Sequence, residues 1–65
     1  MIAKFTKIYT RHYRDNGQTT LYIEWVDRRG VAGRTEAPAP TTNPHMLALW
    51  DACVRQGLTH TFETW

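Results

Sequence analysis

The chain has little of the chemistry on which many small proteins depend. Cys53 is the only cysteine among 65 residues, so no internal disulfide can form. Small secreted domains usually rely on disulfides, so this composition favours a reducing, cytoplasmic location. No segment approaches the roughly 20 apolar residues of a membrane-spanning helix, and residues 1–6 contain no apolar run typical of a signal peptide. We therefore expect a cytoplasmic protein that does not enter membranes.

Motifs for metal binding and catalysis are also missing. His12, His45, His60 and Cys53 lack the close paired spacings of zinc sites. The six carboxylates are scattered along the chain, and no glycine-rich phosphate loop occurs. Cys53 falls on the predicted buried side of a helix, which argues against a reactive thiolate. We expect a protein that is not an enzyme and holds no cofactor or metal.

Charge is sparse but unevenly distributed. Residues 1–34 hold seven basic and three acidic residues, whereas residues 35–65 hold one basic and three acidic residues. The first half is therefore basic and the second half acidic, with a net charge of +2 overall. Such asymmetry can steer an anionic partner, although a solvated surface of mixed charge explains it as well.

Two tripeptides that end in glycine predict hairpin turns, Asp15-Asn16-Gly17 and Arg28-Arg29-Gly30. Glycine accepts the left-handed backbone that closes a three-residue hairpin loop. Residues 19–27 between the turns are the most β-prone segment of the chain. Ile2 to Arg14 forms the strand before them, so the pattern predicts an antiparallel meander.

The length of the first turn decides which side chains share a face. A three-residue loop places Tyr9 opposite Ile23, whereas a two-residue Asn16-Gly17 turn places Tyr9 opposite Glu24. We prefer the three-residue loop because it gathers an apolar core face. That face comprises Phe5, Tyr9, Tyr13, Leu21, Ile23 and Trp25.

The opposite face of this hairpin is neither clearly polar nor clearly apolar. In the preferred register it carries Ile8, Tyr22 and Val26 among threonines and basic residues. A solvated antiparallel face is usually more polar than this. The pattern predicts either a contact surface or a face covered by another strand or subunit.

The second turn gives a consistent register of its own. A three-residue loop places Trp25 over Gly33 and Glu24 directly across from Arg34. Opposite charges across two strands stabilise a sheet, and an aromatic ring shields a glycine in a strand. We expect a third strand over residues 31–36.

A helix is the clearest element of the sequence. Two prolines make residues 37–42 an extended linker that ends the sheet. Asn43 is a favoured N-cap before a helix over Pro44–Gln56, and Gly57 suits the C′ position. Leu58 can then close a Schellman motif. The apolar stripe of the helix is Met46, Leu47, Trp50, Cys53 and Val54.

Residues 58–65 alternate and predict a fourth strand, with Leu58 and Phe62 on one face and Glu63 and Trp65 on the other. It runs parallel to the first or third strand after a right-handed crossover. The expected fold is a single α+β domain over residues 1–65, ordered β-β-β-α-β, with the helix on one face of the sheet. A chain this short buries only roughly 60% of its surface, so a homodimer is an open option.

Three antiparallel strands followed by a helix resemble the small DNA-binding domains at the N-termini of tyrosine-type phage integrases. The likeness covers Tyr13 to Gly17, Trp25 to Gly30 and the helix. It implies a DNA- or RNA-binding sheet, to which basic residues beside tyrosine and tryptophan are suited. The chain departs from that family in its fourth strand and its lower basic charge, and we expect no catalytic domain within these 65 residues.

Residues 20–27 and 33–36 are similar to stretches in short reading frames of tailed phages and prophages. Small phage proteins of this kind often block a host factor by stoichiometric binding, and anti-CRISPR inhibitors are one such group. The resemblance therefore implies an inhibitor of a host protein or nucleoprotein, such as a defence complex.

Our leading hypothesis is this non-enzymatic binding module, and the alternative is the nucleic-acid-binding sheet. Tyrosine and arginine are the side chains that most often anchor interfaces. The candidate contact residues are Arg11, Arg14, Tyr22, Arg28 and Arg29.

Overall fold

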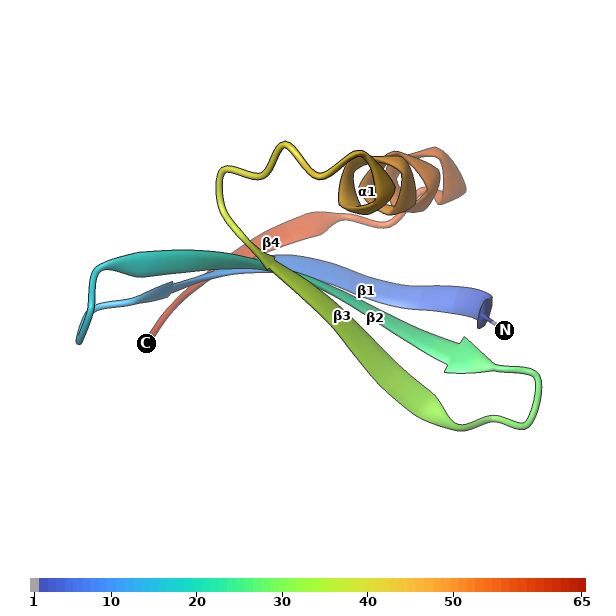
Figure 1. Ribbon diagram of the computed structural model, residues 1–65. Coiled ribbons are helices and arrows are strands. Elements are labelled where there is room, and N and C mark those ends of the chain that lie inside the picture. The colour runs from blue at the N-terminus through green and yellow to red at the C-terminus, as the bar shows by residue number, and fades with distance from the viewer. Residues whose placement is uncertain (1) are drawn as a thin grey trace.

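Four strands and one helix follow one another in the predicted order. The computed structural model describes residues 2–65, with β1 at Ile2–Tyr13, β2 at Gln18–Asp27, β3 at Ala32–Pro38, α1 at Pro44–Gln56 and β4 at His60–Thr64. The strands form one sheet in the order β3-β2-β1-β4, and α1 crosses one face of it (Figure 1). The α+β prediction is confirmed. The sequence left the partner of β4 open, and the structure pairs it in parallel with β1.

The first turn is longer than either length that we considered. Residues 14–17 form a four-residue turn, and Tyr13 pairs with Gln18 across it. The side-chain oxygen of Asn16 accepts a hydrogen bond from the Gln18 N–H at 2.9 Å, and Gly17 has a φ of 68°. The Asn16 side chain therefore stabilises the four-residue turn through a hydrogen bond to the turn's own backbone. Both predicted registers are wrong.

This change of register moves side chains between the two faces of the sheet. Ile8 pairs with Ile23, and Tyr9 pairs with Tyr22. Because neighbouring residues of a strand point to opposite faces, Ile8 enters the core under α1 while Tyr9 and Tyr13 leave the predicted core face. We call the face away from α1 the open face.

A bulge in β1 completes the core. The pairing with β2 shifts by one residue between Phe5 and Lys7, and such a shift turns the strand by half a pleat. Phe5 therefore packs against the same cluster as Ile8, although three positions separate them.

The second hairpin has the predicted register. Trp25 pairs with Gly33 and Glu24 with Arg34, and the Asp27 carboxylate accepts hydrogen bonds from two loop N–H groups at 2.8 and 2.9 Å. β3 continues beyond the expected end, because Pro38 pairs with Thr20. The prediction that residues 37 and 38 belong to the linker is wrong. A proline is tolerated there because β3 is an edge strand.

The helix confirms its predicted bounds and both caps. The side-chain oxygen of Asn43 accepts hydrogen bonds from the N–H groups of His45 and Met46 at 2.9 and 3.3 Å. At the other end Gly57 has a φ of 95°, and the Leu58 N–H donates to the carbonyl of Cys53 at 3.2 Å. This is the predicted Schellman motif. Within residues 2–65 no helix has the length and apolar composition needed to cross a bilayer.

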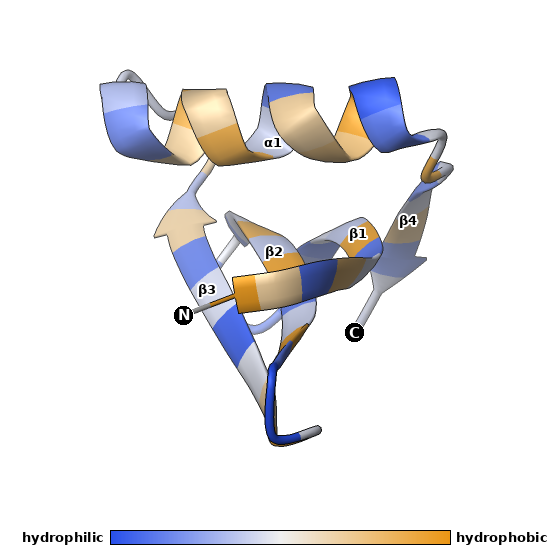
Figure 2. Ribbon diagram, turned by 90° about the vertical axis from the view of Figure 1, so that its right-hand side faces the viewer, coloured by the Kyte–Doolittle hydropathy of each residue, from blue (hydrophilic) through white to orange (hydrophobic). Residues whose placement is uncertain are grey.

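The core lies between α1 and the sheet (Figure 2). Its buried centre is Ile8, Ile23, Met46 and Cys53, flanked by Phe5, Leu21, Ala37, Leu49, Trp50 and Leu58. The predicted helix stripe is only partly correct, because Leu47 and Val54 are 49% and 53% exposed and Leu49 packs inward instead. A helix on a single sheet buries one narrow face, and these two residues lie on its flank.

β4 is shorter than predicted, and the two apolar residues of the predicted strand have different environments. Leu58 precedes the strand and packs against the core, whereas Phe62 is 78% exposed. The helix covers only part of the sheet (Figure 1), and the Phe62 ring lies against that of His60 with the two centroids 4.3 Å apart.

The close contact between Trp25 and Gly33 gives a test of the second hairpin. A Cβ added at Gly33 would overlap the indole ring of Trp25, whose N–H donates to the Thr35 hydroxyl at 3.1 Å. We expect Gly33→Ala to lower the free energy of unfolding by about 1–3 kcal/mol in urea denaturation, because the ring must move and lose that hydrogen bond. Adding Trp25→Leu should recover much of the loss, and Ala32→Ser is the matched control. Wild-type stability of Gly33→Ala would contradict this packing.

Candidate binding surface

The open face carries a cluster of aromatic rings around one arginine. It draws side chains from all four strands, and we call it the arginine–aromatic cluster. Its members are Tyr9, Arg11, Tyr13, Tyr22, Arg34, Glu63 and Trp65. The register of β1 and β2 creates it, because it places three tyrosines on the face that α1 does not cover.

Arg11 lies at the centre of the cluster. Its guanidinium carbon is 4.1 Å from the ring centroid of Trp65, 5.0 Å from that of Tyr22 and 5.3 Å from that of Tyr9. Its side chain is only 15% exposed. A guanidinium held over several rings gains cation–π attraction while its stem excludes water. Arg11 therefore serves as the packing centre of this face.

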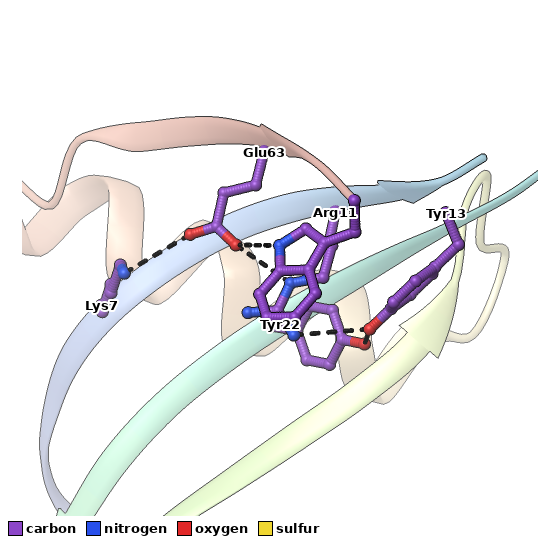
Figure 3. Close-up of polar contacts among 6 residues, drawn as sticks. Lys7, Arg11, Tyr13, Tyr22 and Glu63 are labelled. Carbon is purple, nitrogen blue, oxygen red and sulfur yellow. Dashed lines mark hydrogen bonds and ion pairs between the residues drawn. The ribbon is translucent and has the colours of Figure 1, made fainter. Parts of the chain in front are cut away.

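Glu63 fixes the orientation of the cluster (Figure 3). It accepts hydrogen bonds from Arg11 Nε at 2.9 Å and from the Trp65 indole N–H at 3.1 Å, and Lys7 Nζ lies 3.7 Å from its second oxygen. The hydrogen bond from Arg11, then that from Trp65, lowers the pKa of Glu63 below its usual value. One carboxylate thus ties β4 to β1 and positions the indole.

The tyrosines form the floor of the cluster. The rings of Tyr9 and Tyr22 stack with centroids 4.9 Å apart, and Arg34 lies 4.6 Å over Tyr22 from β3. The hydroxyls of Tyr13 and Tyr22 are hydrogen-bonded. This hydrogen bond, and then the one from Arg11, lowers the pKa of Tyr13. The same hydrogen bond between the hydroxyls, and then burial, raises the pKa of Tyr22. Arg11 Nη1 also donates to the Tyr13 hydroxyl at 3.4 Å.

Trp65 follows β4 and continues its pairing with β1. Its N–H donates to the carbonyl of His12 at 2.8 Å, and its own carbonyl accepts from the Arg14 N–H at 2.9 Å and from Arg14 Nε at 3.4 Å. Trp65 is nevertheless 59% exposed. We call Tyr13, Arg14 and Trp65 the Trp65 corner. It presents a large aromatic side chain that is held in place and open to solvent.

The five predicted contact residues do not form one surface. Arg11 and Tyr22 belong to the cluster, and Tyr22 is only 3% exposed. Arg14 is exposed in the Trp65 corner. Arg28 and Arg29 are exposed in the turn between β2 and β3, which lies at the opposite end of the sheet (Figure 1). The assignment of these residues as contacts stays a prediction.

Glu63 and Trp65 were not among the predicted contact residues, although they organise the site. Their alternation placed both on the same face of the fourth strand, which the structure confirms through their shared contacts with Arg11. The sequence contained no signal for the strand that β4 would join. Without that neighbour, nothing brought them to Arg11.

The α1 side of the sheet presents few polar side chains that could bind a ligand or a metal ion. A groove of about 310 Å³ lies between α1, β2 and the linker, and its described lining is apolar apart from Thr41 and His60. The His60 ring already shares a hydrogen bond with Thr10, and burial lowers the pKa of the imidazole. Among residues 2–65, no three His, Cys, Asp or Glu side chains converge on a point where a metal ion could be held.

No model of a known protein family matches the chain, and neither the curated proteins nor the solved structures contain a significant match to it.

The depressed pKa of Glu63 predicts a loss of stability in acid. A carboxylate with a lower pKa in the folded state stabilises the fold above its unfolded pKa of about 4.3, and this contribution is lost as the pH falls through the folded value. We expect Glu63→Gln to lower the urea midpoint at neutral pH and to flatten its dependence on pH below about 4.3.

The control for this experiment is Asp15→Asn, which removes an exposed carboxylate from the turn between β1 and β2 and leaves Glu63 intact. It should keep the wild-type loss in acid. Equal pH dependence in wild type and Glu63→Gln would show that Glu63 does not stabilise the cluster.

Proposed function

We propose that the chain is a non-enzymatic binding module that blocks or modulates a host protein or nucleoprotein by stoichiometric binding. The Trp65 corner is its principal contact surface. The observation that carries this proposal is an exposed tryptophan whose backbone and indole N–H are both fixed by hydrogen bonds.

Interfaces draw most of their energy from a few side chains, and tryptophan, tyrosine and arginine predominate among them. The corner presents one of each within a small area, since the rings of Tyr13 and Trp65 lie 6.5 Å apart and Arg14 Nε contacts the Trp65 carbonyl. Because these side chains are already ordered, binding loses little conformational entropy. The geometry suits a partner with an apolar pocket beside an acidic group.

The resemblance to short phage reading frames suggests where such a partner is found. It implies a bacterial host protein or nucleoprotein, such as a defence complex, bound in the cytoplasm. The acidic group expected beside the pocket can belong to a protein side chain or to a nucleic-acid phosphate, since arginine binds both.

Removal of the indole tests this proposal. β1 begins at the end of the sheet away from Trp65 (Figure 1), so a tag before β1 leaves the corner free. We expect the immobilised wild type to capture a stoichiometric partner from a bacterial lysate, and Trp65→Ala to reduce its affinity at least about tenfold. Arg14→Ala should also weaken the binding of this partner. The affinities are measured by titration of the purified partner.

The matched control is Val31→Ala, which shortens a residue that is 57% exposed in the turn at the other end of the sheet. It should bind like the wild type. Circular dichroism separates lost contacts from lost folding, since Trp65 also packs on Arg11. If Trp65→Ala and Arg14→Ala both fold and bind unchanged, the corner is not the contact surface.

One observation favours nucleic-acid binding as the second candidate function. Arg28 and Arg29 are exposed, and the Asp27 carboxylate orders their turn through the N–H groups of Arg29 and Val31. Neither arginine is in an ion pair within residues 2–65. An ordered turn with two solvated arginines can contact phosphates or enter a groove.

Salt dependence distinguishes this second candidate from the first. A nucleic-acid binder should lose affinity for labelled duplex or single-stranded DNA steeply between about 50 and 200 mM salt, because bound phosphates release counterions. The double variant Arg28→Ala with Arg29→Ala should bind more weakly with a shallower slope, and Arg55→Ala on α1 should not. No binding at about 50 mM salt would exclude this function.

A further inference from the structure

The outer edge of β3 has the features of a strand that pairs with a copy of itself. β3 is the last strand on its side of the sheet (Figure 1). An open edge exposes unpaired N–H and C=O groups that another strand can bind. The side chains and the backbone of β3 together indicate which strand that is.

The direction of the backbone groups follows from the hairpin. The Asp27 N–H donates to the Val31 carbonyl, and the Ala39 N–H donates to the Thr19 carbonyl. Since hydrogen-bonded residues alternate along an antiparallel ladder, the odd-numbered residues of β3 bond to β2. The even-numbered residues therefore direct their backbone groups outward. These are Ala32, Arg34, Glu36 and Pro38.

The charges on β3 are complementary to those of a second β3 strand that runs in the opposite direction. Arg34 and Glu36 are exposed and have opposite charge two positions apart, and neither is in an ion pair within residues 2–65. An antiparallel copy centred on Thr35 brings Arg34 of one chain opposite Glu36 of the other, twice. Charged side chains, especially lysine, often keep an edge strand from pairing, but the two charges of β3 have opposite sign, so they attract rather than repel a reversed copy.

The two features select the same register. The residues that meet as opposite charges are also the residues whose backbone groups point outward, so each pair can exchange backbone hydrogen bonds and an ion pair. Thr35 meets Thr35 of the second copy between them, a favourable pair on the α1 side. Pro38 lies at the end of this ladder, where its missing N–H removes only the last bond.

We propose that β3 pairs antiparallel with β3 of a second copy about a two-fold axis at Thr35, which joins two sheets into one continuous sheet. This interface lies on the edge of the sheet opposite β4. It is therefore separate from the Trp65 corner, and a dimer of this kind presents two such corners.

Sedimentation equilibrium over a range of concentrations tests the dimer. Wild type should dimerise, and Glu36→Pro should weaken the dimer at least about tenfold while keeping the fold, because it removes only an outward N–H. Glu36→Arg should also weaken it, since it places two arginines opposite each other. The double variant Arg34→Glu with Glu36→Arg should restore it. Asp51→Arg makes the same charge change on exposed α1 and should have no effect.

Cross-linking tests the register itself. Paired residues that are not hydrogen-bonded lie close enough for a disulfide. Thr35→Cys should therefore form a covalent dimer under mild oxidation, whereas Ala32→Cys, which faces Pro38 of the second copy, should not. The native Cys53 is buried and does not compete.

Three outcomes would overturn the proposal. The first is a wild type that stays monomeric at every concentration, and the second is a dimer unaffected by Glu36→Pro. The third is a charge-swapped variant that folds but does not dimerise. If the wild type is monomeric and Glu36→Pro no longer captures the host partner, the β3 edge pairs with a strand of that partner instead of with a second copy. The variants of the Trp65 corner should leave dimerisation unchanged, so the two proposals can fail independently.

Discussion

The pairing of Ile8 with Ile23 and of Tyr9 with Tyr22 is the constraint on which the rest of the structure depends. Neighbouring residues of a strand face opposite sides, so this single register sends the isoleucines under α1 and the tyrosines to the open face. A slip by one residue would exchange them. The helix would then lie on tyrosine hydroxyls, and Arg11 would have no rings to contact.

The open face shows how a small sheet can cover aromatic rings without a second helical layer. Arg11, Arg34 and Lys7 lie over the rings of Tyr9 and Tyr22. Their aliphatic stems shield apolar surface while the charged groups stay near solvent. Part of the basic charge in the first half of the chain is therefore structural. The proposed contacts with a host partner use basic residues at the ends of the sheet, in the Trp65 corner and in the turn of Arg28 and Arg29.

The two edges of the sheet differ in a way that matters for association. β4 is short, is fixed to β1 by Glu63 and leads to Trp65. β3 is longer, has a bulge-free pairing with β2 and has self-complementary charges. A chain of this size buries a small core, as the four residues at its buried centre show. Strand pairing between copies is one way for such a chain to gain buried surface.

Sequence alone determined the elements whose signals are local. Asn43 and Gly57 bound α1 because a cap needs only neighbouring N–H and carbonyl groups, and a single glycine turn set the register of the second hairpin. Tertiary structure decided the first turn and the partner of β4, because the register of a strand depends on which of its side chains the whole sheet buries. The candidate site followed the same division. The sequence made Arg14 a contact candidate at the end of the first strand, but its place beside Trp65 depends on two segments 51 residues apart, which only the folded sheet brings together.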